Sequence, residues 1–264
     1  HEYKRQLMNA LSLVDLYNCL KEDEDFRAAF PPVAVIFGAK AAAGYDRAKS
    51  IIYFCNKVAE LINGDPEVND RLRVVFVQNY NCSYAERIIP AADLSQQISP
   101  AGTEASGTGN MKLMLNGAIT LGTLDGANIE IAQQAGQENE YIFGATAQEI
   151  DAIRETYNPN DIYRASPRIR RAVDALVDGS ICEPDAGLTE LHDALLKGAS
   201  WHRPDHHFLL LDFAAYQAAR LRAYMEYKDE PRAFARKCLL NIAGAGPFSA
   251  DRAVSQYAEN IWRV

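Results

Sequence analysis

The stretch SPAGTEASGTGNMKLMLNGAITLGTLDGANIEI, residues 99–131, combines a glycine-rich turn, one lysine and two apolar runs. Gly107 and Gly109 flank Thr108, and because glycine has no Cβ, the backbone there can adopt positive φ and approach a ligand closely. Residues 110–115 are good helix formers, so a helix would begin with its free N–H groups and positive dipole end facing the turn. The stretch therefore predicts a cradle for an anion such as a phosphate group.

The lysine of this stretch is spaced to act on whatever the cradle holds. In a helix, Thr108 and Lys112 are four residues apart and share one face, so the amine of Lys112 projects toward the turn. Positions 111 and 113–115 are apolar, and such neighbours favour the neutral, nucleophilic form of an amine. This arrangement suits a phosphorylated aldehyde that forms a Schiff base, and pyridoxal phosphate is the usual cofactor of that kind.

The spacing alone also fits plainer interpretations. A glycine-rich turn often only closes a loop, and a single lysine on a helix is usually a solvated surface residue. The pattern differs from the G-x-x-x-x-G-K-[ST] phosphate loop, because Lys112 is not adjacent to the second glycine, and G-x-G-x-x-G is not present either.

The exact string, however, is far more specific than its spacing. GTEASGTGNMKLMLNGAITLGTLDGANIE, residues 102–130, closely resembles the cofactor segment of the α-glucan phosphorylases, the family of glycogen, starch and maltodextrin phosphorylases. The resemblance implies that Lys112 carries pyridoxal 5'-phosphate as a Schiff base and that the amides of Gly107, Thr108 and Gly109 receive the cofactor phosphate. It also implies that Glu104 and Ser106 face the hydroxyls of the glucosyl unit.

The first residues, HEYKRQL, continue a second motif of that family. The resemblance implies that Lys4 approaches the phosphate groups and that Tyr3, together with Gly107, lies beside the sugar. Lys4, Glu104 and Lys112 are then the catalytic residues that it implies. Taken without the resemblance, Lys4 and Arg5 indicate an exposed charged face of an amphipathic helix that begins at the start of the chain.

Strands and helices alternate in the first half of the chain, as in parallel α/β proteins, which bind ligands at the carboxyl ends of their strands. Tyr80 follows the second strand. The resemblance implies that Tyr80 lies near the cofactor, whereas its position in the sequence alone suggests a half-buried tyrosine in a turn. The predicted strands are residues 33–37, 71–78, 118–124 and 141–144, with a loop at 91–102, and the predicted helices are residues 45–63, 84–89, 110–115, 127–135 and 147–157.

Helix starts are predicted from capping residues. Ser83 with Glu86 and Thr146 with Glu149 have the spacing of capping boxes. Asp125 could serve the site or cap the helix that follows it, and capping is the expectation from sequence. Five amphipathic helices are predicted after residue 158, at residues 167–176, 188–196, 208–227, 231–242 and 250–262.

We therefore expect an α/β fold with a Rossmann-like parallel sheet, helices on both of its faces and a helical C-terminal extension. By resemblance this is the C-terminal, cofactor-binding domain of a GT-B type glycosyltransferase fold. Residues 1–150 form its α/β part and residues 151–264 its mainly helical part. The resemblance also implies that residues 1–264 are a fragment, without the N-terminal domain and the first strands of this domain.

The composition limits the partners that can be expected. The formal net charge of −8 argues against nucleic acid and anionic membranes, and no apolar run reaches about 18 residues, the length that spans a bilayer. The odd number of widely spaced cysteines indicates reduced thiols in a cytoplasmic protein. Pro204 interrupts helical pairing among His202, His206 and His207, so no metal site is expected there.

The resemblance implies the reversible phosphorolysis of a terminal α-1,4-linked glucose, with an α-glucan, inorganic phosphate and glucose 1-phosphate as partners and a homodimer as the parent protein. The 264 residues alone are expected to be inactive, because one wall of the cleft is missing. The alternative is a nucleotide-sugar glycosyltransferase, in which the turn holds a diphosphate and Lys112 remains a free amine.

Overall fold

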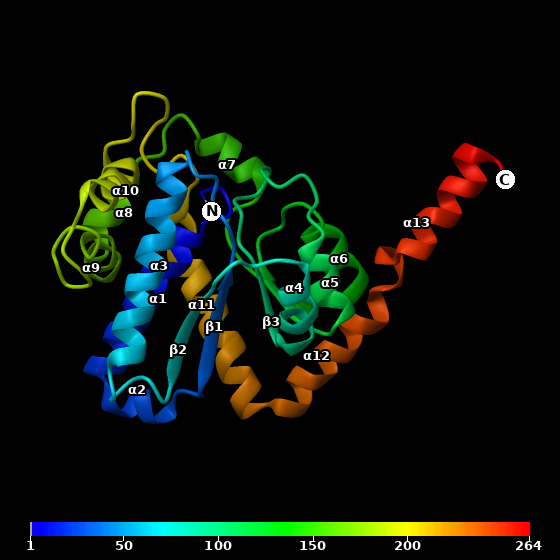
Figure 1. The fold of residues 1–264 in the computed structure, drawn as a ribbon, viewed down its shortest axis with the longest axis horizontal. Coiled ribbons are helices and arrows are strands. Elements are labelled where there is room, and N and C mark those ends of the chain that lie inside the picture. The colour runs from blue at the N-terminus through cyan, green and yellow to red at the C-terminus, as the bar shows by residue number, and fades with distance from the viewer. Residues whose placement is uncertain (1) are drawn as a thin grey trace.

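The computed structural model describes residues 2–264 and has an α/β body from which the last helix projects (Figure 1). Every strand pair among these residues is parallel, but the strands form two separate sheets instead of one. The first sheet pairs β1 (Val33–Gly38) with β2 (Leu72–Val77). The second has the order β3-β4-β5, with β3 (Leu94–Gln97), β4 (Ile119–Gly122) and β5 (Tyr141–Ile142).

The two sheets differ in how they are covered. All four residues of β4 are buried, as expected for a parallel strand with elements packed on both faces. In the first sheet, Val35 and Val74 are buried, whereas Ile36 and Val75 are 49% and 47% exposed. The described residues therefore cover one face of the β1–β2 sheet, and the prediction of helices on both faces holds for the second sheet only.

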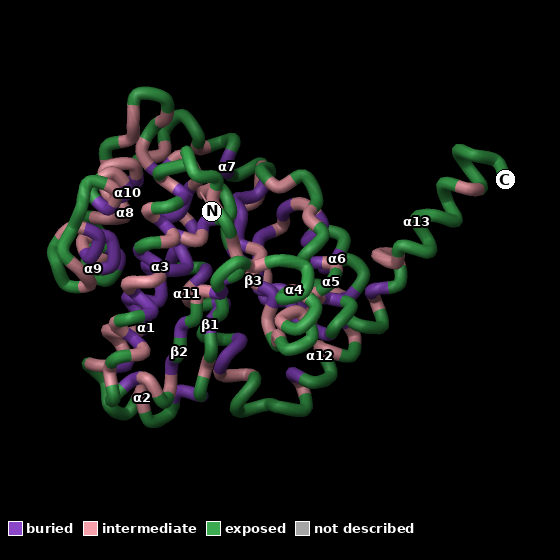
Figure 2. The backbone as a smooth tube through the Cα atoms, viewed as in Figure 1, coloured by how far each residue is buried: buried purple, intermediate pink, exposed green. Residues whose placement is uncertain are grey.

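The helix at the start of the chain, α1 (Gln6–Glu22), is a core helix. Residues 7–16 are all buried, because α1 packs against α3, α9 and α11 on different sides. A helix that is apolar nearly all round is typical of such a central position. The prediction of a single apolar face for this segment was therefore wrong, and Figure 2 shows the buried backbone that runs through this part of the molecule.

Most predicted helices are confirmed, with ends that shift by a few residues. Two short helices, α2 and α8, and strand β3 were not predicted. The first-half helices are α2 (Glu24–Ala29), α3 (Asp46–Gly64), α4 (Cys82–Ile88), α5 (Gly109–Leu115), α6 (Asn128–Ala135) and α7 (Ala147–Ile153). The later helices are α8 (Pro159–Ala165), α9 (Pro167–Asp174), α10 (Ala186–Leu196), α11 (Leu209–Asp229), α12 (Pro231–Gly244) and α13 (Ala250–Tyr257), with a final turn at Ala258–Trp262.

One of the two predicted capping boxes is correct. The side chains of Thr146 and Glu149 form a reciprocal capping box at the start of α7. At α4 the cap is Asn81, whose side chain accepts a hydrogen bond of 3.2 Å from the amide of Tyr84. Ser83 lies inside this helix instead of at its start, so the capping box with Glu86 does not form.

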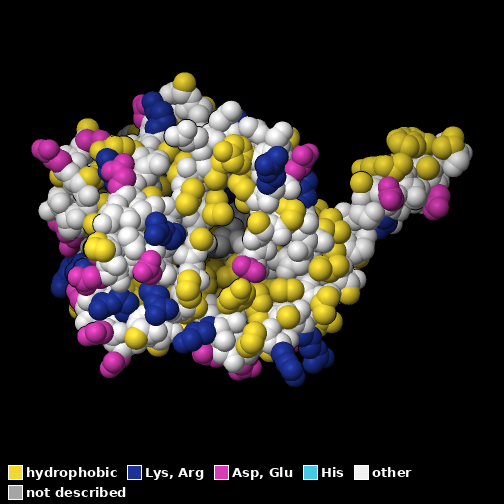
Figure 3. All heavy atoms as spheres, turned by 60° about the horizontal axis from the view of Figure 1, so that its bottom comes forward, with side chains coloured by type: hydrophobic (Ala, Val, Ile, Leu, Met, Phe, Trp, Pro, Cys, Tyr) yellow, Lys and Arg dark blue, Asp and Glu magenta, His cyan; other side chains and the backbone are white. Residues whose placement is uncertain are grey.

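The last helix lies apart from the body. Figures 1 and 3 show α13 projecting into solvent, with hydrophobic side chains along it. Val254, Tyr257 and Ile261 are each more than half exposed.

The five cysteines are free thiols, as expected. Within residues 2–264, no helix combines the length and the apolar character that crossing a bilayer requires.

A buried carboxyl group lies behind β4. Glu140 is 4% exposed, and one of its oxygens accepts a hydrogen bond of 2.6 Å from the amide of Thr120. Its other oxygen, Thr120 Oγ1 and Asn241 Oδ1 have no hydrogen-bond partner among the described residues. Burial raises the pKa of Glu140 to about 8, although the hydrogen bond from the Thr120 amide, the nearby Asn241 side chain and the charge of Lys237 oppose this shift. A proton on Glu140 would give these acceptor oxygens a donor.

Replacement of Glu140 by glutamine is expected to remove a pH dependence of stability. The folded state holds the proton up to a pH of about 8, whereas the unfolded chain releases it near 4.5. The wild type therefore loses stability relative to Glu140→Gln as the pH rises from about 4.5 to about 8. Urea unfolding across this range measures the difference. The exposed Glu138→Gln change is the control, and parallel pH profiles for Glu140→Gln and wild type would contradict the expectation.

Candidate functional site

The glycine-rich turn leads directly into α5. Gly107 has a φ of +89°, which favours glycine, and a Cβ at this position would lie 3.1 Å from Asn110 Oδ1 and crowd that side chain. Thr108 is the residue before the helix, and Gly109 is its first residue. Gly109 is not among the residues with positive φ, so only Gly107 uses the freedom that the sequence suggested for both glycines.

Asn110 holds the turn in shape. This side chain is buried, and its Nδ2 donates to Asn128 Oδ1 at 3.1 Å while its Oδ1 accepts from the amide of Met111 at 3.0 Å. Among the described residues, no acceptor bonds to the backbone N–H groups of residues 107–109. The turn is therefore held by Asn110 while the amides of residues 107–109, which are at least partly exposed, keep their donors unused, as a turn that binds an anion requires.

Lys112 lies one helical turn after Thr108, and its amide donates to the Thr108 carbonyl at 3.2 Å. Its side chain is exposed, in contrast to the apolar environment that its neighbours suggested. The reason is the direction of the helix: Met114 points into a small core with Ile131, and Lys112 points away from it. No hydrogen bond or ion pair occupies the Lys112 amine within the described part of the chain.

Asp125, which follows β4, organises the loop before the turn. Its Oδ2 accepts from Ser99 Oγ and from the amide of Glu104, both at 2.8 Å, and its Oδ1 accepts from the amide of Gly102 at 2.9 Å. The prediction that Asp125 caps α6 was wrong, because Ala127 precedes that helix without a side-chain cap. Asp125 instead positions the backbone that carries Glu104.

The loop also approaches the segment after β4 closely. The amide of Ala127 donates to the Ser106 carbonyl at 2.8 Å. Gly126 has a φ of +52°, and a Cβ there would lie 2.7 Å from the same carbonyl oxygen. The Ser106 side chain is exposed and its hydroxyl donates to the Gly107 carbonyl at 3.3 Å. Ser106 is thus fixed through its backbone, and its side chain remains at the surface beside the turn.

Glu104 forms an ion pair with Lys4, which comes from the other end of the sequence. The Glu104 side chain is 20% exposed and that of Lys4 is 49% exposed, and the Lys4 amine also lies 5.0 Å from the centre of the Tyr3 ring. Burial by itself lowers the pKa of Lys4, but the hydrogen bond and charge of Glu104, with a smaller effect of Tyr3, raise the net pKa above its ordinary value. Lys4 is therefore a cation at neutral pH, next to the sugar-facing carboxylate that the sequence predicted.

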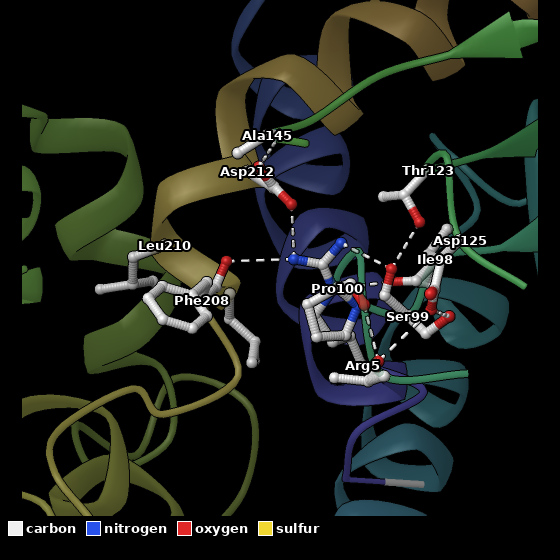
Figure 4. A network of polar contacts seen from close by, with 12 residues as sticks. Arg5, Ile98, Ser99, Pro100, Thr123, Asp125, Ala145, Phe208, Leu210 and Asp212 are labelled. Atoms are coloured by element: carbon white, nitrogen blue, oxygen red, sulfur yellow. Dashed lines mark hydrogen bonds and ion pairs between the residues drawn. The ribbon is translucent and has the colours of Figure 1, made fainter. Parts of the chain in front are cut away.

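Arg5 joins this segment to the loop and to α11 (Figure 4). The Arg5 side chain is completely buried. Its Nε donates to the Ile98 carbonyl at 2.5 Å, and one terminal nitrogen donates to the Phe208 carbonyl at 3.1 Å and pairs with Asp212 Oδ2 at 2.7 Å. The interpretation of Arg5 as part of an exposed charged face was wrong. Its buried network fixes the position of the neighbouring Lys4.

Tyr80 lies at the carboxyl end of the first sheet. Its ring packs on Gly38, the last residue of β1, so closely that a Cβ there would lie 2.8 Å from the ring. Asn79, with a φ of +50°, makes the turn that places the ring. Among residues 2–264, no hydrogen bond or ion pair connects the side chain of Tyr80 or Lys112 to the other predicted site residues. The structure thus brings Lys4, Tyr3 and Glu104 into contact, with the turn directly following along the chain.

Replacement of Asp125 by alanine is expected to lower the free energy of unfolding by about 2–3 kcal/mol, because the Ser99 hydroxyl and the amides of Gly102 and Glu104 lose their acceptor. Hydrogen exchange measured by mass spectrometry should become faster in residues 99–104 than elsewhere. The control is Asp151→Ala, which removes an aspartate that is 72% exposed. Unchanged exchange in that loop would contradict the role of Asp125.

The fold and this geometry define a parallel α/β protein in which a glycine-containing turn, whose amides have no acceptor among the described residues, is followed by an exposed lysine. The family model described as carbohydrate phosphorylase matches residues 1–264, the whole chain. The chain therefore belongs to the carbohydrate phosphorylase family, and its α/β architecture is consistent with the GT-B type fold of that family.

Several curated relatives agree with this assignment. The brain form of glycogen phosphorylase from Bos taurus is 47% identical over 265 residues, which cover 99% of this chain and 30% of the relative. The brain form from Homo sapiens is 46% identical, and the match covers 100% of this chain and 30% of the relative. Glycogen phosphorylase from Chlamydia trachomatis is 45% identical, and the match covers 100% of this chain and 31% of the relative. The chain spans about 30% of the length of these relatives. The match favours a phosphorylase over the nucleotide-sugar glycosyltransferase that the turn alone left open.

Proposed function

We propose that this chain carries the pyridoxal 5'-phosphate site of an α-glucan phosphorylase, with the cofactor held as a Schiff base on Lys112. The observation that carries the proposal is the set of amides at residues 107–109 without an acceptor among the described residues, one helical turn before an exposed amine that also lacks a partner there. The amides suit a phosphate group and the amine suits an aldehyde. Membership of the carbohydrate phosphorylase family supports the same cofactor.

The residues around the turn fit this cofactor. Gly107 leaves room for a phosphate because it has no side chain, and the amides of Gly107, Thr108 and Gly109 would donate to its oxygens. Lys112 would hold the aldehyde carbon, and Tyr80 would lie beside the bound group. When bound, the cofactor would supply its phosphate group for proton exchange with the phosphate of the substrate.

The residues that contact Glu104 are proposed to bind the other substrates. Glu104 and Ser106, with Tyr3 and Gly107, would bind the hydroxyls of a glucosyl unit through hydrogen bonds. Lys4 would attract the substrate phosphate and offset the repulsion between two neighbouring phosphate groups. The Lys4 amine is half exposed and already charged, so an anion can reach it without unfolding the site.

For the whole protein we propose the reversible phosphorolysis of terminal α-1,4-linked glucose. Its partners would be an α-glucan, inorganic phosphate and glucose 1-phosphate. A homodimer in the cytoplasm is proposed on the same basis, that of the glycogen phosphorylases to which the chain is similar. Because the chain spans about 30% of their length, these proposals concern the protein that contains it.

The test compares Glu104→Gln with the wild type in the protein that contains this chain. The variant is expected to release glucose 1-phosphate from glycogen and phosphate at least about 100-fold more slowly, because the carboxylate that would bind the sugar is lost. The absorbance of the bound cofactor should be unchanged. Glu130→Gln, in α6, is the control and should be as active as the wild type. Full activity of Glu104→Gln would contradict the assigned role, and a wild type without phosphorolysis would contradict the proposed function.

A further inference from the structure

A cluster of two histidines and one glutamate lies outside the site described above. Glu2 precedes α1, and His206 and His207 precede α11. Glu2 Oε1 is 3.7 Å from His206 Nε2 and 3.9 Å from His207 Nε2, and the three donor atoms all lie within 4.8 Å of one another. The three side chains are 18%, 32% and 19% exposed, so an ion can reach the cluster from solvent while the donors stay sheltered.

These separations are close to those of a coordinated ion. Zinc bound tetrahedrally by imidazole nitrogen and carboxylate oxygen lies about 2.0–2.1 Å from each donor, which puts the donors about 3.4 Å apart. Glu2 Oε1 therefore needs to approach each histidine nitrogen by about 0.5 Å or less, and the two histidine nitrogens, which lie within 4.8 Å of each other, need to approach by up to about 1.4 Å. Changes of side-chain torsion suffice for such a movement, because Glu2 lies in the segment before α1 and is not part of a helix.

Neighbouring rings hold the two imidazoles in place. The rings of His206 and His207 lie with their centroids 3.7 Å apart. The ring of His202 stacks on that of His206 at a centroid distance of 4.2 Å and helps to hold its orientation.

The present partners of Glu2 can be replaced. Arg47 donates to Glu2 Oε1 at 2.5 Å, and Tyr45 donates to the other carboxylate oxygen. Arg47 has a second carboxylate partner, because its Nε lies 3.1 Å and 3.2 Å from the two oxygens of Glu190. An ion that takes Glu2 Oε1 therefore displaces one contact of Arg47 and leaves its charge paired.

We propose that Glu2, His206 and His207 form a binding site for a divalent transition-metal ion, with Zn²⁺ as the ion that this donor set fits best. Two imidazoles and one carboxylate are a ligand set that zinc uses in proteins, with the fourth position left to water. Hard ions such as Mg²⁺ prefer oxygen ligands and are excluded by the two nitrogens. The bound ion links the segment that carries Tyr3 and Lys4 to the segment before α11.

The test measures Zn²⁺ binding alone, by competition with a chromogenic chelator, on the 264-residue chain. The wild type is expected to bind one equivalent, and His206→Ala and His207→Ala to bind it at least tenfold more weakly. His192→Ala is the control, since His192 lies in α10 beside Asp174 and Asp193. Arg47→Gln is expected to bind Zn²⁺ more tightly than the wild type, because it removes the competing cation from Glu2. Thermal melting without metal checks that each variant is folded.

Two further readouts exclude other ligands. The Co²⁺ derivative is expected to lack a thiolate charge-transfer band, because none of the cysteines takes part, and His1→Ala is expected to bind like the wild type. Equal affinity of the wild type, His206→Ala and His207→Ala would overturn the proposal. A thiolate band in the Co²⁺ derivative, or loss of Zn²⁺ binding in His1→Ala alone, would also overturn it. The same holds if the wild type does not bind one Zn²⁺ per chain.

Discussion

Replacement of Arg5 by methionine is expected to lower the free energy of unfolding by about 3–5 kcal/mol, the usual cost of breaking a buried ion pair by removing one partner. Asp212 is 1% exposed, and among the described residues the change leaves its carboxylate buried with the amide of Ala145, at 2.9 Å, as its one remaining donor. The carbonyl of Ile98 loses the donor Nε, and that of Phe208 keeps the longer bond from the amide of Asp212, at 3.4 Å. Urea denaturation measures the loss as a lower midpoint with an unchanged slope.

The double variant Arg5→Met with Asp212→Leu is expected to recover part of this loss, because it removes the unpaired charge. Arg171→Met is the matched control. Arg171 forms an ion pair with Glu22 in which both side chains are more than half exposed, so its loss is expected to cost less than about 1 kcal/mol. If Arg5→Met cost no more than Arg171→Met, the Arg5 network would not be the connection that holds the start of the chain to the loop.

Replacement of Lys112 by alanine is expected to abolish covalent attachment of pyridoxal phosphate while leaving the fold intact. The amine is the only group of this residue that can form a Schiff base, so the absorbance of the bound cofactor should disappear completely. Stability should change by less than about 0.5 kcal/mol, because Lys112 is exposed and has no side-chain partner among the described residues.

Two variants sharpen this expectation. Lys112→Arg keeps the positive charge and cannot form a Schiff base, so it should also fail to attach the cofactor. Lys197→Ala removes a lysine that directly follows α10 and is 70% exposed, and this variant should retain full attachment. Retention of the absorbance band by Lys112→Ala would contradict the assignment of the cofactor to this residue.

Local patterns in the sequence predicted the regular elements well. The apolar runs of β1 and β2 and the helical spacing of α3, α9, α11 and α12 are properties of neighbouring residues, and these elements form close to the expected positions. Strand β3 was missed because LSQQ is polar and is held in the sheet by backbone pairing with β4. The short helices α2 and α8 contain too few residues for a periodic pattern.

The contacts that shape the site were less predictable. Arg5 bonds to residues 93 and 203 positions away, and nothing beside it in the sequence distinguishes it from an exposed arginine. Asp125 precedes a helix, which suggested a cap, but its partners lie 21–26 positions earlier. Asn110 was missed for the same reason, since its side chain bonds to Asn128 in another helix. The exposure of Lys112 depends on which side of α5 faces the core. The sequence of a seven-residue helix is too short to predict that side.

The assignment of the cofactor to Lys112 can be tested directly by reductive trapping. The 264-residue chain is mixed with pyridoxal phosphate, reduced with borohydride and digested, and mass spectrometry then identifies the labelled lysine. One label per chain is expected, on the peptide that contains Lys112, because among the described residues this amine follows a turn whose unbonded amides can hold the phosphate. A label on another lysine such as Lys4, a label spread over the exposed lysines, or no label at all would contradict it.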